Sequence, residues 1–163
     1  RFMTGYPEVA ISGTFIAEFV TSTDLICSYR KLPVVHPQIL RFAKQRNPMN
    51  HMTVFFKKSA VLQAGNYQPF LGYEDYWLWI RMLQNKCLMA NLPESLVYAR
   101  IGNNMHARRH GSKFFLQELK LQQRLLRVGF LTKSDYVKNI FLRAFPRLLP
   151  IWGLKLVYSF IRK

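Results

Sequence analysis

The chain has 163 residues, half of which are apolar, with 24 Lys and Arg against 8 Asp and Glu. This length and apolar content suffice for a folded core and exclude a disordered chain. The two cysteines, Cys27 and Cys87, lie far apart and fit neither a disulfide framework nor a cysteine zinc site, which predicts a reducing, cytosolic environment.

The first half of the chain alternates between strand and helix patterns. β-Branched and aromatic residues predict a buried strand over 9–20, and Pro37 followed by apolar residues at helical spacing predicts a helix over 36–46. Residues 51–56 have a strand pattern, residues 57–65 a helical pattern that ends at Gly65, and residues 66–73 the composition of a loop.

A longer helix is predicted from Glu74 to Lys86, with acidic residues at its start and basic residues toward its end, as the helix dipole favours. Two short strands over 87–92 and 95–101 flank Pro93-Glu94, and 102–111 is a loop. Three helices follow, near 112–128, 132–145 and 148–161. The pattern predicts an α/β fold, with one domain over 1–111 and a helical extension over 112–163.

The basic charge is concentrated toward the C-terminus. Residues 100–163 hold 14 basic and 2 acidic residues, which favours a nucleic acid, an anionic membrane face or a phosphorylated ligand as a partner. Arg143, Arg147 and Lys155 interrupt the apolar tail, so it is not expected to span a bilayer. Its composition fits an amphipathic helix in the headgroup layer, or equally a surface helix packed on its own domain.

Glu74 and Asp75 are the only adjacent acidic residues, and they open the aromatic-rich helix. One interpretation is helix capping, because a carboxylate at a helix N-terminus accepts hydrogen bonds from backbone N–H groups. The other interpretation is that one carboxylate caps the helix while its neighbour acts as a general base for an incoming hydroxyl.

A basic loop over 105–111 collects His106, Arg108 and Arg109 beside glycine. Such a loop is either a solvated surface or a site for a diphosphate, since arginine binds phosphate oxygens in a bidentate manner. His51 lies at the edge of the predicted strand over 51–56. It either faces the same site as the basic loop or has a structural role.

Two segments carry a family resemblance. The run NPMNHMTVFFKKSAVLQAGNYQPFLGYEDYWLWIRML (47–83) and the run ARIGNNMHARRHG (99–111) resemble the C-terminal half of family 2 inverting glycosyltransferases. The features that coincide are Asn-Pro and His51 before a strand, a helix that ends in Ala-Gly-Asn-Tyr, and a Glu-Asp pair entering a Trp-containing helix. The resemblance implies a GT-A (Rossmann-like) fold with a mixed sheet flanked by helices, and a place in bacterial exopolysaccharide, capsule or lipopolysaccharide synthesis.

The resemblance also implies roles for individual residues. Asp75 matches the catalytic base that removes the proton of the acceptor hydroxyl, and Glu74 is its supporting neighbour. The substrate-binding positions are His51, His106, Arg108, Arg109 and Trp77. The donor would be a nucleotide-diphosphate sugar and the acceptor a lipid-linked saccharide. The protein would be cytoplasmic and peripheral to the inner face of the plasma membrane, bound to anionic lipid through residues 112–163.

The chain departs from the family pattern before residue 47. The complete enzymes carry an N-terminal nucleotide-binding half and an Asp-X-Asp motif that binds Mg²⁺ or Mn²⁺, and neither is found here. We therefore expect the divalent cation to belong to the complete enzyme and assign no metal ligand in this chain. The chain is expected to be a fragment or the product of a truncated reading frame, without metal-dependent catalysis of its own.

Two other functions compete with the transferase. A basic module that binds nucleic acid is less favoured, because no finger spacing, helix-turn-helix pattern or Gly-flanked aromatic sheet motif is found. A non-catalytic protein that only adheres to membranes is the other alternative.

Overall fold

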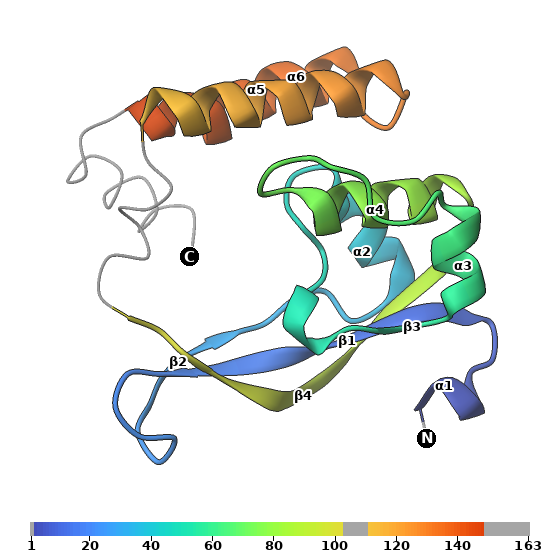
Figure 1. Ribbon diagram of the computed structural model, residues 1–163, viewed down its shortest axis with the longest axis vertical. Helices are drawn as coiled ribbons and strands as arrows, with labels where there is room; N and C mark the ends of the chain where they lie inside the picture. The colour runs from blue at the N-terminus through green and yellow to red at the C-terminus, as the bar shows by residue number, and fades with distance from the viewer. Residues whose placement is uncertain (1, 103–110, 149–163) are drawn as a thin grey trace. The chain divides into compact units, whose positions relative to one another are not determined.

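The computed structural model describes residues 2–102 and 111–148, and the chain divides into two compact units, Arg1–Ile101 and Gly102–Lys163. The predicted basic loop, with His106, Arg108 and Arg109, and nearly all of the predicted helix over 148–161 lie outside the described residues. The predicted α/β class is confirmed for the first unit (Figure 1).

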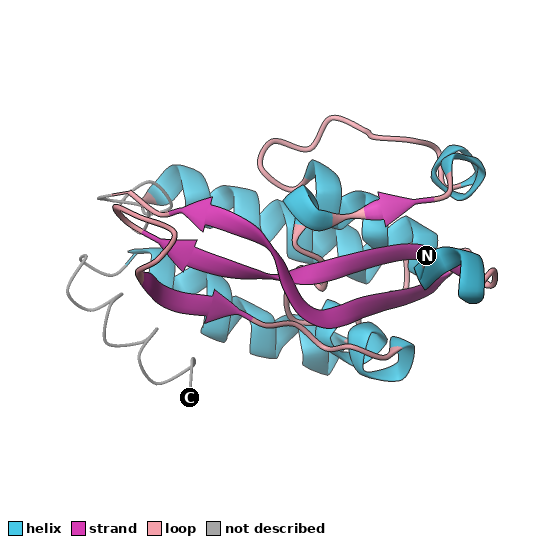
Figure 2. Ribbon diagram, turned by 90° about the horizontal axis from the view of Figure 1, so that it is seen from below, coloured by secondary structure: helices cyan, strands magenta, loops and turns pink. Residues whose placement is uncertain are grey.

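A mixed sheet organises the described part of the first unit. Its central strand is β1 (Val9–Phe19), buried along almost its whole length, as the sequence predicts. Strand β4 (Leu88–Arg100) runs parallel to β1 along one edge, whereas β2 (Ile26–Arg30) and β3 (Phe55–Phe56) pair antiparallel with different parts of the other edge. Figure 2 shows this strand layer from below.

Helices cover the sheet. Helices α2 (His36–Ala43) and α4 (Glu74–Gln84) lie over one side of it, and α1 (Phe2–Gly5) lies beside the N-terminal end of β1 (Figure 1). Helix α3 (Lys58–Gln63) follows β3. Seven consecutive or near-consecutive side chains of α4 are buried, so this helix forms the centre of the core: Tyr76, Trp77, Leu78, Trp79, Ile80, Met82 and Leu83.

The structure corrects two predicted strands. Residues 51–56 are not one strand, because His51–Thr53 form a 3₁₀ turn and only Phe55–Phe56 pair with β1. Pro93 does not divide the segment 87–101. Thr14 of β1 pairs with Leu92, and the next residue of β1 pairs with Ser95, so that Pro93 and Glu94 form a bulge within one strand. A bulge leaves residues unpaired, and proline has no N–H to donate, so the bulge tolerates Pro93. Strand β2 was not predicted.

The second unit is helical in its described part. Helix α5 (Ser112–Arg127) matches the prediction, and α6 (Lys133–Asn139) begins at a capping box made by Thr132 and Asp135. The predicted helix over 132–145 does not stay α-helical, since it continues as a π-helical turn (Ile140–Ala144) and a 3₁₀ turn (Phe145–Leu148).

Candidate functional site

Asp75 lies in the first turn of α4, where its carboxylate has two roles. Oδ1 accepts the backbone N–H of Tyr76 at 2.7 Å, one of the N–H groups of the first turn that have no partner within the helix. Oδ2 faces away from the helix and accepts the side-chain amide of Asn47 at 2.7 Å. The side chain of Asp75 remains 19% exposed, so a hydroxyl can approach it.

His51 lies near the same oxygen of Asp75. Its Nδ1 is 4.0 Å from Oδ2 of Asp75, and its Nε2 is 3.1 Å from the hydroxyl of Tyr67. The imidazole is 55% exposed, which leaves room beside it for a ligand. The structure therefore brings together the predicted residues Asp75 and His51. It adds Asn47 and Tyr67, which lie in the motifs that carry the resemblance but have no predicted role.

The surroundings of Tyr67 change the pKa of its hydroxyl. Burial raises the pKa of Tyr67 above its ordinary value of 10.0, and the negative charge of Asp75 raises it further. The hydroxyl is therefore protonated at neutral pH and can donate to His51 or to a ligand. The Tyr67 ring also meets Trp79 edge to face, with centroids 6.4 Å apart.

The loop that carries Tyr67 is held by α4. Arg81 donates to the carbonyl oxygens of Ala64 and Asn66, at the left-handed turn formed by Gly65 and Asn66. The guanidinium lies over the ring of Trp77 at 5.4 Å from its centroid. These contacts fix the loop against the helix whose first turn holds Asp75.

Two predicted residues of α4 point elsewhere. Trp77 is only 4% exposed, and its indole N–H donates to the side chain of Gln68 at 2.9 Å. This partly buried contact connects the helix to the loop that carries Tyr67. The carboxylate of Glu74 accepts the backbone N–H of Gly72 at 3.2 Å, in the turn before the helix.

The segment that carries Asn47 and His51 is anchored to the sheet by two buried asparagines. Asn50 donates to the carbonyl oxygen of Thr14 at 2.9 Å, and Asn91 of β4 donates to that of Pro48 at 3.1 Å. Because both amides connect the segment to paired strands, the sheet determines where Asn47 and His51 stand relative to α4.

The site does not fit a hard divalent cation. Among residues 2–102 and 111–148, no group of three or more His, Cys, Asp or Glu side chains lies close enough to hold a metal ion. Because Mg²⁺ and Mn²⁺ require clustered oxygen ligands, we assign no catalytic step to a metal here.

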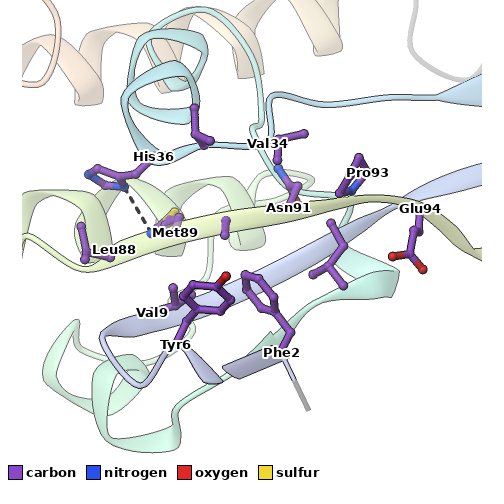
Figure 3. Close-up of a pocket in the computed structure, with 13 residues that line it drawn as sticks. Phe2, Tyr6, Val9, Val34, His36, Leu88, Met89, Asn91, Pro93 and Glu94 are labelled. Atoms are coloured by element: carbon purple, nitrogen blue, oxygen red, sulfur yellow. Dashed lines mark hydrogen bonds between the residues drawn. The ribbon is translucent and has the colours of Figure 1, made fainter. Parts of the chain in front are cut away.

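A cavity of about 430 Å³ lies away from this site, between α1 and β4, and is lined by none of the predicted site residues (Figure 3). Its walls are mainly apolar. Its polar side chains are those of Tyr6, His36, Asn91 and Glu94. His36 accepts the backbone N–H of Met89, and the amide nitrogen of Asn91 donates to backbone carbonyls. The chemistry therefore points to Asp75 rather than to the cavity.

Three relatives from bacteria are similar to nearly all of the chain. A protein of Haemophilus influenzae described as an uncharacterized glycosyltransferase is 40% identical over 99% of the chain. The amylovoran biosynthesis glycosyltransferase AmsE of Erwinia amylovora is 34% identical over 99% of it. The UDP-Gal:α-D-GlcNAc-diphosphoundecaprenol β-1,3-galactosyltransferase of Escherichia coli is 35% identical over 91% of it.

All three relatives are named glycosyltransferases. The predicted resemblance to glycosyltransferases is therefore confirmed by sequence similarity. The chain spans only 60%, 60% and 54% of the lengths of these curated relatives, respectively. No protein-family model and no solved structure matches the chain.

Proposed function

We propose that the chain is the acceptor-side part of a family 2 inverting glycosyltransferase with a GT-A fold, acting in the synthesis of a cell-surface polysaccharide. The observation that carries the proposal is the Asp75 carboxylate, which is held by Asn47 and Tyr76, remains partly exposed and lies beside His51. The similarity to three named glycosyltransferases supports the reaction class.

In this proposal, Asp75 acts as the general base. An aspartate is ionised at neutral pH and accepts the proton of the acceptor hydroxyl as its oxygen attacks the anomeric carbon of the donor sugar. The new bond joins the acceptor oxygen to that carbon. The bond between the carbon and the diphosphate breaks, and its electron pair leaves with the nucleotide diphosphate. One direct displacement inverts the configuration at the anomeric carbon.

The surroundings of Asp75 suit this role. The carboxylate has about four lone-pair sites, and the two hydrogen bonds described above use one on each oxygen. The remaining capacity of Oδ2 lies on the side of His51, where we place the acceptor hydroxyl. His51 and Tyr67 offer polar groups and ring faces to a sugar at that position.

The donor and any divalent cation belong to parts of the protein not described in the structure. We propose a nucleotide-diphosphate sugar as the donor, with His106, Arg108 and Arg109 contacting its diphosphate, and Mg²⁺ or Mn²⁺ bound in the complete enzyme. The acceptor we propose is a lipid-linked saccharide, since the Escherichia coli relative is named for a diphosphoundecaprenol-linked substrate.

We also propose peripheral binding to the cytoplasmic face of the plasma membrane through residues 112–163. No helix among the described residues is long and apolar enough to cross a bilayer. The described part of this region combines basic residues with exposed apolar side chains. The exposed apolar residues are Leu116, Val137, Phe141, Leu142, Phe145 and Leu148. We expect the chain to bind vesicles that contain anionic lipid, and this binding should weaken as salt is added. Equal binding to neutral vesicles would contradict the proposed membrane contact.

The test of the proposed reaction is a transfer assay on the full-length protein. The first pair of substrates is UDP-galactose and GlcNAc-diphosphoundecaprenol, followed by other nucleotide sugars. A glycosylated lipid product whose new linkage has the opposite anomeric configuration to the donor is expected. Retention of configuration, or hydrolysis of the donor without transfer across the panel, would contradict the proposal.

A further inference from the structure

Asn47 has an orientation that the structure defines at both ends of its amide. Its Oδ1 accepts the backbone N–H of Met49 at 3.2 Å, and its Nδ2 donates to Oδ2 of Asp75 at 2.7 Å. The backbone N–H can only donate, so the oxygen of the amide must face Met49 and the NH₂ group must face the carboxylate. The residue therefore presents a donor to Asp75, never an acceptor.

The neighbours of Asn47 connect it to the sheet by hydrogen bonds. Pro48 follows it directly, and the carbonyl oxygen of Pro48 accepts from the buried amide of Asn91 on β4. Asn50 connects the same segment to the carbonyl oxygen of Thr14 on β1. Asn47 thus links the first turn of α4 to two strands of the sheet.

We propose that Asn47 is a positioning residue for the catalytic base. It holds Oδ2 of Asp75 in the orientation in which its remaining lone pair meets the acceptor hydroxyl beside His51. This inference rests on the proposed function. It assigns to Asn47 no contact with the substrate, so the effect of Asn47 on the reaction passes through the carboxylate.

The kinetic consequence is a loss in the chemical step rather than in binding. Replacing Asn47 by alanine removes one of the two hydrogen bonds that hold the Asp75 carboxylate and leaves only the one from the Tyr76 N–H. Misplacing a reacting group by about 1 Å can cost roughly 10²-fold in rate. We expect Asn47→Ala to lower kcat by about 10-fold to 100-fold and to leave KM within about 3-fold. Asn85→Ala is the matched control, because Asn85 follows α4 at its other end and donates to the carbonyl oxygen of Gln63.

The hydrogen bond itself is tested without any transfer reaction. The carboxyl ¹³C signal of Asp75 is followed against pH by NMR in the chain of 163 residues, in parallel with the signals of His51 and Tyr67, the titratable groups that face it. We expect the titration of Asp75 to move to higher pH in Asn47→Ala, because a donor to the charged form is lost. A larger move in the same direction is expected in Asn47→Asp, because a second carboxylate then faces the first. Asn85→Asp should leave the titration in place.

The two experiments separate the inference from the proposed function. A shifted titration together with a lower kcat at constant KM supports the positioning role. An unshifted titration, or a wild-type kcat in Asn47→Ala, overturns it even if the full-length protein transfers sugar. A wild-type protein that transfers no sugar would overturn the proposed function, whatever the NMR titration gives.

Discussion

Gly13 of β1 has no room for a side chain. A Cβ atom at this position would lie 2.5 Å from Oδ1 of Asn91 and 3.2 Å from Cε of Met49. Asn91 is the amide that anchors Pro48, so a displaced Asn91 would also displace the segment that leads to His51. The absence of a side chain at Gly13 is thus a condition for the candidate site.

We therefore expect Gly13→Ala to destabilise the chain by about 1–3 kcal/mol, the usual cost of overpacking a core. Urea unfolding at neutral pH measures this difference. Gly5→Ala is the matched control, because no atom lies within 4 Å of a Cβ at Gly5, and its effect should be small. Equal stability of Gly13→Ala and the wild type would show that the packing around Asn91 is looser than described.

Tyr67 reports the charge of Asp75. Burial raises the pKa of the Tyr67 hydroxyl above 10.0, and the nearby carboxylate adds to that increase. Asp75→Asn removes the charge but not the burial, so the pKa of Tyr67 should fall while staying above its ordinary value. Titration of the ring carbon next to the hydroxyl by ¹³C NMR checks this. An unchanged pKa in Asp75→Asn would mean that the two groups are not neighbours.

The sequence predicts some residues of the site and misses others for a physical reason. Asp75 and His51 stand out because an acidic pair opens a helix and a histidine precedes a strand. Asn47 and Asp75 are 28 positions apart, and their contact depends on how the sheet places the segment. No local pattern encodes such a contact. The resemblance run did contain Asn47 and Tyr67, but it gave neither residue a role.

At the scale of elements, α2 is joined to β4 by a histidine. His36 opens α2, and its Nδ1 accepts the backbone N–H of Met89 at 3.2 Å, which only an unprotonated Nδ1 can do. Burial lowers the pKa of His36 below 6.5. The unfolded chain therefore binds this proton more readily than the folded chain does.

The sign of the pH dependence follows from that difference. The contribution of His36 to stability is complete above pH 6.5 and is lost as the pH falls through the folded-state pKa. We expect the free energy of unfolding to fall less between pH 7.5 and pH 5.5 in His36→Gln than in the wild type. Urea unfolding at the two pH values measures this difference. An equal fall of the free energy of unfolding in His36→Gln and the wild type would show that His36 does not contribute to the pH dependence.

The helices of the second unit are joined by a buried carboxylate. Glu118 of α5 is fully buried and accepts from Arg143 at 2.9 Å and from Arg147 at 2.6 Å. Removing one partner of a buried ion pair costs about 3–5 kcal/mol, so Glu118→Gln should destabilise this unit strongly. Amide hydrogen exchange over residues 112–148 measures the loss. Glu94→Gln, an exposed change of the same kind, should alter that exchange little.

Element boundaries were predictable where local pattern dominates. The buried run of β1 and the dipole-matched ends of α4 are properties of contiguous residues, and both elements were predicted. The local pattern at Pro93 predicts a strand boundary, yet the parallel pairing with β1 continues beyond it through a bulge. Pairing partners lie far away in the sequence, so a bulge and a boundary look alike in the local pattern. Strand β2 is short and half-exposed, and its pattern did not stand out.

At the scale of the whole molecule, sequence similarity and local chemistry point to the same reaction. The three relatives are named glycosyltransferases, and their similarity extends over nearly the whole length of the chain. The chain spans 54–60% of the length of these relatives. The described residues supply a positioned carboxylate but not the ligands of a divalent cation. Under the proposed function, Asp75 supplies the base and other parts of the protein supply the ligands of the cation.

The most direct test of that account is the rate of sugar transfer by full-length Asp75→Asn. Loss of a general base typically costs about 10²-fold to 10⁴-fold, and we expect kcat to fall within that range while folding is preserved. Asp24→Asn is the control of identical chemistry, since Asp24 lies in an exposed turn and accepts from Ser22. Transfer by Asp75→Asn at the rate of Asp24→Asn would contradict the assignment of Asp75 as the base.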